Sequence, residues 1–231
     1  MDAKIQIQKQ RGIVLFLIKI LVFANFFLFL HLIYYSCSCF ILNTRLIMNK
    51  DLRKVVILLA HPNMKESQAN KALIDAVSDI EGVAVFNLYD QQGASFDVDE
   101  WSKIISDASA LIYQFPFHWM AAPSLLKKWQ DEVFTFLSKT PAVAGKPLTV
   151  VTTTGSEYEA YRSGGRNRFT VDELLRPYQV SAIHSGMSWQ TPVVVYGMGT
   201  ADAGKNIAEG ANLYKQRVEM LIGSSNAGNN W

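Results

Sequence analysis

Short apolar runs rich in β-branched residues alternate with longer helical stretches along most of this 231-residue chain. Five runs are predicted to be strands, at residues 54–60, 83–89, 110–115, 148–154 and 191–197. Five other stretches are predicted to be helices, at residues 67–79, 98–108, 123–138, 170–185 and 201–222. The runs are almost continuously apolar, which suits strands covered on both faces in a parallel sheet. The alternation therefore predicts a doubly wound α/β domain, a five-stranded parallel sheet with helices on both faces.

The first 47 residues differ from the rest of the chain. Residues 20–42 form an apolar run of 23 residues, and a helix that spans a bilayer needs about 20. No clean secretory cleavage site follows the run, so it is either an uncleaved membrane anchor or not part of the native protein. Met48 supports the second alternative, because a polar lead into the first strand begins there. We predict an apolar leader at 1–47, a folded domain at 48–222 and a disordered tail at 223–231.

Charge and cysteine content exclude several classes of function for the folded part. The leader carries a net charge of +4 and the remainder −2, so the basic excess does not lie on a surface that could bind nucleic acid. Cys37 and Cys39 are the only cysteines. Because both lie in the leader, the domain has no disulfide framework and no thiolate chemistry. The four histidines show no metal-ligand spacing, and no metal site is expected.

Ligands of doubly wound domains bind beyond the carboxyl ends of the strands, and three loops there carry suitable residues. The loop after the first strand leads to Ser67 at a helix start, where free N–H groups form a phosphate cradle; a simple helix cap is the alternative. Residues 115–123, FPFHWMAAP, place aromatic rings between two prolines, either to hold a planar ligand or to fill the core. Residues 152–156, TTTGS, supply hydroxyls and a glycine. Three such loops at one edge predict a single ligand site.

The motifs in these loops resemble those of the NAD(P)H:quinone oxidoreductases of the flavodoxin-like fold. They are AHP with S-x-x-N after the first strand, Q-x-P-x-x-W before a P-S-L-L-K-x-W-x-D helix, and T-T-G after the fourth strand. Residues 155–177, GSEYEAYRSGGRNRFTVDELLRP, are more similar still to the ancillary subunits of bacterial glutathione-regulated potassium-efflux systems, which belong to the same family. The resemblance extends over residues 54–221 and leaves the leader uncovered.

The resemblance implies a flavodoxin-like fold, a flavin cofactor and an oxidoreductase activity. The cofactor that it implies is FMN, with FAD as the alternative, and the implied electron donor is NADH or NADPH. A member of this family is expected to pass a hydride from the donor through the flavin to a quinone or a similar electrophilic acceptor. The residues that match the family's cofactor-binding loops are His61, Ser67, Gln68, Ala69 and Asn70, then Phe117, His118, Trp119 and Met120, and finally Thr153, Thr154, Gly155 and Ser156.

The resemblance also implies catalytic roles for Tyr161 and Trp119. Tyr161 matches the tyrosine over the substrate pocket. The N–H groups of Trp119 and Met120 are expected to point at the N5 and O4 edge of the ring. Two positions depart from the family. Ser156 replaces a glycine without consequence for binding by backbone groups, whereas Asn167 replaces the histidine that assists the tyrosine in protonating a quinone.

The family further implies a homodimer, to which the predicted helix at 123–138 contributes, and a place in the cytoplasm or at the inner face of the plasma membrane. The alternative function is a flavin-containing regulatory subunit that activates a potassium-efflux antiporter with little turnover.

Within the predicted helices, Trp129 and Phe136 are interpreted as core or dimer contacts and His184 as a core histidine.

Four arginines lie in or after the loop that follows the fourth strand, and two interpretations remain open. They form either a solvated face or a clamp, and a clamp would bind an NADPH phosphate or the acidic surface of a transporter. The four are Arg162, Arg166, Arg168 and Arg176.

Overall fold

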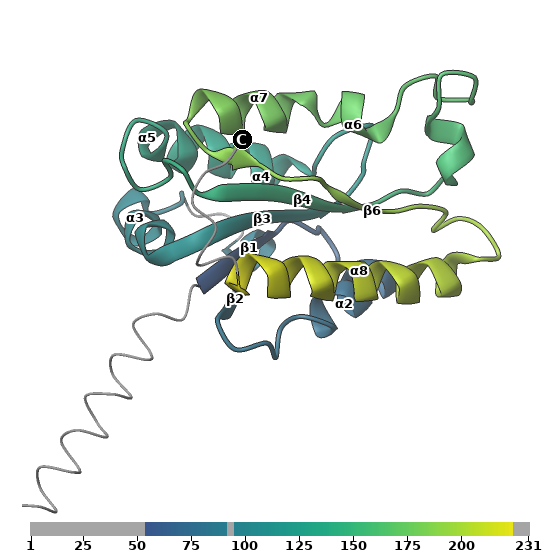
Figure 1. Ribbon diagram of the computed structural model, residues 1–231, viewed down its shortest axis with the longest axis horizontal. Helices are drawn as coiled ribbons and strands as arrows, with labels where there is room; N and C mark the ends of the chain where they lie inside the picture. The colour runs from purple at the N-terminus through teal and green to yellow at the C-terminus, as the bar shows by residue number, and fades with distance from the viewer. Residues whose placement is uncertain (1–53, 92–94, 224–231) are drawn as a thin grey trace, which may run out of the picture. The chain divides into compact units, whose positions relative to one another are not determined.

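The computed structural model describes residues 54–91 and 95–223 (Figure 1). The predictions for the leader at 1–47 and for the tail beyond Gly223 lie outside these residues. Within the described part of the chain, no helix combines the length and the apolar character that a membrane span requires.

The centre of the fold is a parallel sheet, as predicted. Its strands are β1 (Lys54–Leu59), β2 (Val83–Asn87), β3 (Ala108–Pro116), β4 (Pro147–Thr153), β5 (Ser188–Trp189) and β6 (Val193–Val195). The order is β2-β1-β3-β4, and both β5 and β6 pair with β4 at the same edge. The predicted fifth strand at 191–197 is therefore wrong in its bounds. Pro192 lacks an N–H group for the ladder, and it lies between the two short segments that share this position.

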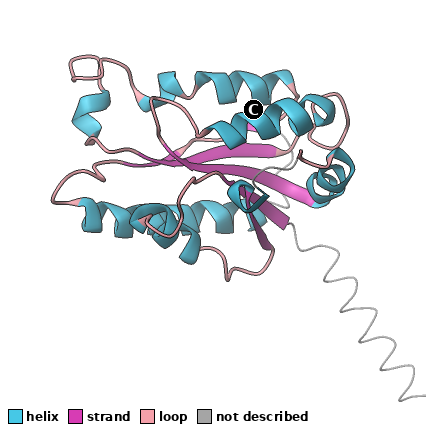
Figure 2. Cartoon of the chain, turned by 180° about the vertical axis from the view of Figure 1, so that it is seen from behind, coloured by secondary structure: helices cyan, strands magenta, loops and turns pink. Residues whose placement is uncertain are grey.

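Helices cover both faces of the sheet (Figures 1 and 2). They are α2 (Gln68–Asp75), α3 (Val98–Asp107), α4 (Ser124–Trp129), the π-helical turn η2 (Gln130–Phe134), α5 (Thr135–Leu137), α6 (Val171–Leu174), α7 (Arg176–His184) and α8 (Ala203–Gly223), with short 3₁₀ turns η1 (Leu88–Gln91) and η3 (Tyr158–Tyr161). Helices α2 and α8 pack on one face around Ile57, Leu73 and Tyr214. Helices α3, α4 and α7 pack on the other, around Trp101 and Trp129. Two cores thus enclose β1, β3 and β4.

The predicted helices differ from the structure in three places. The helix predicted at 67–79 ends at Asp75. Pro123 is the N-cap of α4 and not its first helical residue. The predicted helix at 170–185 is two helices, because the backbone turns at Leu175 and Pro177, in the first turn of α7, has no N–H to donate to the preceding turn.

The exposure of three side chains on these helices bears on their interpretation. Trp129 is buried in the core, whereas Phe136 is 58% exposed, so that of its two alternatives only the dimer contact is left. His184 is exposed at the end of α7 and is therefore not a core histidine.

The contact between α8 and β6 gives the first testable prediction. A Cβ atom on Gly210 would lie 2.4 Å from Cγ2 of Val195, and a β-branched valine has little freedom to move away. We expect Gly210→Ala to lower the free energy of unfolding by about 1–3 kcal/mol, measured by urea denaturation. Gly204→Ala is the control in the same helix, because its Cβ would meet open space, and it should raise stability by a few tenths of a kcal/mol. Equal gains from both variants would contradict the close approach.

Candidate functional site

The loop after β1 ends at the N-terminus of α2. Ser67 is the N-cap of α2, and its side chain accepts a hydrogen bond from the N–H of Asn70 at 3.2 Å, as predicted for a capping serine. Among the described residues, the N–H groups of Gln68 and Ala69 donate to no protein acceptor. Because these donors lie at the positive end of the helix dipole, they suit a phosphate.

His61 lies in the same loop as a neutral imidazole. Its Nδ1 accepts a hydrogen bond from the N–H of Asn63 at 3.1 Å. Partial burial lowers the pKa of His61, and the nearby His118 lowers it further. The proton of the neutral ring is therefore assigned to Nε2, which makes this atom a hydrogen-bond donor.

A buried polar network joins this helix terminus to two strand ends. The side chain of Asn70 donates from Nδ2 to the hydroxyl of Thr153 at 3.2 Å. Gln114 Nε2 donates to the main-chain oxygen of Asn70 at 3.1 Å and, more weakly, to its side-chain oxygen at 3.4 Å. All three side chains are buried. The network therefore fixes the start of α2 relative to the carboxyl ends of β3 and β4.

The loop after β3 forms a tight turn with unusual backbone geometry. His118 and Ala121 exchange two hydrogen bonds, of 2.9 and 3.0 Å. The two central residues, Trp119 and Met120, have positive φ angles of 48° and 64°, which side-chain-bearing residues adopt at a cost. In the described structure their N–H groups have no protein acceptor, and Trp119 is 98% exposed. The turn thus presents two free donors and an indole to solvent.

Both ends of this turn are held by the rest of the domain. The N–H of Phe117 donates to the main-chain oxygen of Thr153 at 2.9 Å. At the other end, the N–H of Ala122 donates to the hydroxyl of Tyr178 on α7 at 2.9 Å. Sequence reasoning missed Tyr178, since nothing in the pattern pairs it with a loop 56 residues earlier.

Tyr178→Phe tests this second attachment. The variant keeps the buried ring but leaves the N–H of Ala122 without its acceptor, and we expect a loss of about 1–2 kcal/mol in the free energy of unfolding. Hydrogen exchange at Ala122 should accelerate in parallel. Tyr214→Phe is the matched control, because the hydroxyl of Tyr214 is buried without a partner, so that its removal should leave stability unchanged or increase it. Equal losses in the two variants would mean that the bond to Ala122 does not stabilise the turn.

The loop after β4 is fastened to the segment that follows β6. Thr154 donates its N–H to Val195 at 2.9 Å, and Gly199 donates to the main-chain oxygen of Gly155 at 2.8 Å. A Cβ on Gly155 would meet nothing within 4 Å, so a ligand can approach this backbone closely. Ser156 accepts a hydrogen bond from the guanidinium of Arg166.

Tyr161 lies behind this loop as a neutral phenol. Its ring is buried, with the Phe117 ring at 6.3 Å and the Tyr196 ring at 5.9 Å between centroids. Burial raises the pKa of Tyr161, while Arg166 and a hydrogen bond with Thr154 partly offset the rise. Asn167 donates its main-chain N–H to Ala160 at 2.9 Å, and its side-chain Nδ2 is buried without a partner.

The three predicted loops therefore meet at one edge of the sheet, and their chemistry fits a flavin mononucleotide. The free N–H groups at α2 suit its phosphate, the exposed turn offers two donors to the polar edge of a ring, and Gly155 leaves space for close backbone contact. Gln114 is the other residue of the site to which the sequence assigned no role. It was present as the first residue of the Q-x-P-x-x-W motif, but the motif does not show that its side chain bonds to Asn70.

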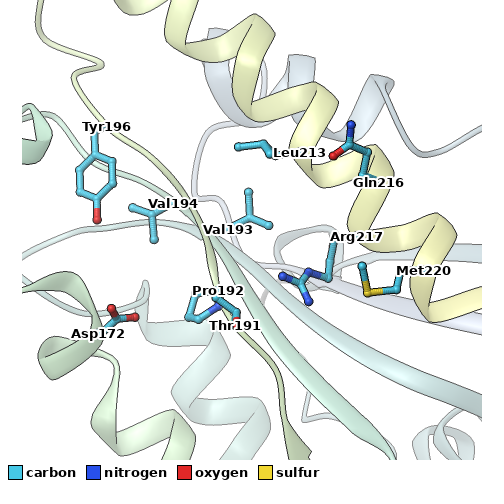
Figure 3. Close-up of a pocket in the computed structure, with 10 residues that line it drawn as sticks. All are labelled: Asp172, Thr191, Pro192, Val193, Val194, Tyr196, Leu213, Gln216, Arg217 and Met220. Carbon is cyan, nitrogen blue, oxygen red and sulfur yellow. The ribbon is translucent and has the colours of Figure 1, made fainter. Parts of the chain in front are cut away.

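Two of the cavities in the described residues lie beside α8 and beside α7. One of about 370 Å³ lies between β6 and α8, with Val193 and Arg217 in its lining (Figure 3). The other, of about 590 Å³, lies between α7 and the α4–α5 segment and touches Met120 at its rim. In the described residues, no group of three His, Cys, Asp or Glu side chains is arranged to hold a metal ion.

The sequence matches a known protein family and several curated proteins. A family model described as a flavodoxin-like fold matches residues 53–218. The chain is 34% identical over 176 residues to an uncharacterized NAD(P)H oxidoreductase of Bacillus subtilis, YdeQ, which covers 74% of this chain and 89% of the relative. It is 36% identical over 148 residues to the glutathione-regulated potassium-efflux system ancillary protein KefG of Serratia proteamaculans, covering 62% of this chain and 81% of the relative.

A solved structure agrees with the sequence comparison. The general stress protein 14 of Treponema denticola, solved in complex with FMN, is 31% identical and superposes with a TM-score of 0.67. The match covers 73% of this chain and 99% of that protein.

Proposed function

This chain belongs to the family of proteins with a flavodoxin-like fold, and from that premise we propose that it is an FMN-dependent NAD(P)H oxidoreductase. The observation that carries the proposal is the turn at Trp119 and Met120, which presents two free N–H groups. The loop that contains this turn is hydrogen-bonded to Thr153, and Thr153 also accepts the hydrogen bond from Asn70 at the start of α2. The similarity to an NAD(P)H oxidoreductase and to an FMN-binding structure supports it.

The binding roles follow from the donors at each loop. The N–H groups of Gln68 and Ala69 would hold the phosphate of FMN, assisted by Nε2–H of His61. The N–H groups of Trp119 and Met120 would donate to the polar edge of the ring that carries N5 and O4, and the backbone of Gly155 would contact its pyrimidine edge. When bound, FMN supplies hydride acceptance from NAD(P)H and transfer to an acceptor.

Tyr161 and Trp119 contribute most directly to the reaction. The N–H of Trp119 would stabilise negative charge on a bound reduced flavin by donating a hydrogen bond to its ring. The raised pKa of Tyr161 keeps its hydroxyl protonated at neutral pH, so it can donate a hydrogen bond to an acceptor oxygen. Asn167 can orient a ligand or the tyrosine, but its amide cannot deliver a proton as a histidine would. We therefore assign the acceptor's proton to Tyr161 or to water.

A quinone or similar electrophile is the proposed acceptor, and NADH or NADPH the donor. FAD is the alternative cofactor, since the same loops serve both flavins. Because the donor is a cytoplasmic metabolite in this proposal, the protein works in the cytoplasm, either free or at the inner face of the plasma membrane.

A homodimer is part of the proposal. Three exposed apolar side chains lie on the helices that flank the groove between α7 and the α4–α5 segment: Phe136 on α5, and Val180 and Ile183 on α7. A second copy packed there would cover these side chains and enclose the rim at Met120. Sedimentation of the full chain at two concentrations tests this assembly.

The second candidate function is regulatory. The similarity to KefG favours a flavin-loaded subunit that activates a potassium-efflux antiporter while turning over slowly. It uses the same FMN site, so the two functions differ in turnover and not in cofactor binding.

The deciding experiment uses the purified full chain supplied with FMN. Its absorbance is recorded between about 350 and 500 nm, where bound flavin absorbs, and NADPH and a quinone are then added. We expect a yellow protein that is bleached by NADPH and recovers its colour with the quinone. A colourless protein defeats both functions, whereas a yellow protein with negligible turnover favours the regulatory one.

A further inference from the structure

Three arginines on the loop between η3 and α6 form a cationic cluster beside the proposed ring site. They are Arg162, Arg166 and Arg168, and all are exposed. In the described residues, ion pairs join Lys127 to Asp131, Lys128 to Glu132 and Lys205 to Glu209, and none involves the three arginines. Glu157 and Glu159 lie just before the loop, but neither pairs with a guanidinium. The positive charge of the loop is therefore available to a ligand.

The loop and two of these guanidinium groups are held in place. Arg166 donates to the hydroxyl of Ser156. Arg162 lies 5.2 Å from the centre of the Tyr158 ring and donates to its hydroxyl at 3.4 Å. The loop itself folds tightly on η3, since a Cβ on Gly165 would lie 2.1 Å from the main-chain oxygen of Glu159. Much of the entropy of ordering these side chains is thus already lost before a ligand binds.

The cluster borders the reacting end of the site. Arg166 is close enough to Tyr161 to lower the pKa of its hydroxyl against the effect of burial, and its anchor Ser156 belongs to the loop after β4. Two aromatic rings flank the arginines and remain exposed to solvent, Tyr158 at 50% and Phe169 at 56%. The loop thus combines guanidinium groups, which bind phosphate, with ring faces on which a planar base can stack.

We propose that this loop binds the adenosine 2′-phosphate end of NADPH and makes the protein prefer NADPH to NADH. The inference rests on the proposed function, because the nicotinamide of the donor must lie beside Tyr161 over the ring. A dinucleotide extended from that point carries an adenine and a phosphate, which match the exposed aromatics and the arginines. The 2′-phosphate is the only group that distinguishes the two donors. Guanidinium groups that bind it would therefore raise the affinity for NADPH over that for NADH.

The kinetic test compares the two donors in the full-length, FMN-loaded protein. The readout is the ratio of kcat/KM for NADPH to kcat/KM for NADH, which cancels effects that are common to both donors. We expect a ratio of about ten or more in the unmodified protein, and a fall of about tenfold or more in Arg162→Gln and in Arg166→Gln. Arg176→Gln on α7, whose guanidinium donates to Gln179, is the control and should keep the ratio. A ratio near one in the unmodified protein, or no fall in either variant, overturns the inference.

A second arm separates the donor from an anionic acceptor, which would present similar chemistry. The variants are assayed with a neutral quinone and with a sulfonated one. If Arg162→Gln and Arg166→Gln lower kcat/KM for the sulfonated acceptor alone and leave the donor ratio unchanged, the cluster serves the acceptor and the inference is wrong.

A third arm separates failure of the inference from failure of the proposed function. Calorimetric titration of the full chain with adenosine 2′,5′-bisphosphate and with AMP needs neither flavin nor turnover. We expect the bisphosphate to bind about tenfold more tightly or better, and Arg166→Gln to remove the difference. If the bisphosphate binds more tightly in a protein that is colourless or inactive, the arginine loop binds the 2′-phosphate but the protein is not an oxidoreductase. Equal affinity for the two nucleotides would reject the anion site.

Discussion

Replacing Asn70 with alanine is expected to lower the free energy of unfolding by about 1–3 kcal/mol and to weaken FMN binding by about tenfold or more. The variant removes the donor to the hydroxyl of Thr153 and one of the two acceptors of Gln114. It also leaves a small cavity between α2 and the sheet, because the Asn70 side chain is buried. The network joins the helix start that we propose for the phosphate to the loop that we propose for the ring, so loosening it should cost binding as well as stability.

The two effects are measured separately. Urea denaturation of the flavin-free protein gives the stability, and quenching of flavin fluorescence gives the dissociation constant. Thr149→Val is the matched control, because Thr149 is also buried in the sheet and donates one hydrogen bond, to Thr191 at 3.0 Å, but lies toward the opposite end of β4. It should lose about 1 kcal/mol without any change in FMN affinity. If Asn70→Ala loses stability yet binds FMN normally, the network has no part in shaping the site.

That the three loops of the candidate site meet at one edge of the sheet could be predicted from sequence, because the carboxyl ends of parallel strands share an edge and only the strand ends need to be known. Strand ends are set by local pattern, and Phe117, Thr154 and Ser67 all lie where the pattern indicated. Local chemistry also sufficed for the cap at Ser67, since it involves residues three apart.

Contacts between distant residues could not be predicted in the same way. The bonds from Gln114 to Asn70 and from Ala122 to Tyr178 join residues 44 and 56 positions apart, and no periodicity encodes such pairs. Breaks inside apparently regular elements were missed for a related reason. Pro192 and Pro177 interrupt a strand and a helix whose apolar patterns continue on both sides, so the pattern alone extends the element too far.

The positive φ angles at Trp119 and Met120 give a prediction with opposite signs for stability and binding. Glycine adopts such angles without the clash that a Cβ causes, so the double variant Trp119→Gly with Met120→Gly relieves strain of about 1–2 kcal/mol per residue. Part of this gain is offset by the greater backbone entropy of glycine in the unfolded chain. We expect a net rise of about 1 kcal/mol in the free energy of unfolding of the flavin-free protein.

The same double variant should bind FMN about tenfold or more weakly, because the flexible turn no longer holds its two N–H donors in place and the indole that would cover the ring is lost. Trp119→Phe is the control that keeps both an aromatic ring and the backbone strain, and it should change stability and affinity by little. Loss of stability in the glycine variant would show that the turn is not strained in the folded protein. Unchanged affinity would show that the turn does not touch the flavin. Only a rise in the free energy of unfolding together with weaker FMN binding agrees with a strained turn. Such a turn lowers the stability of the folded protein but holds its two N–H groups in the conformation that binds the ligand.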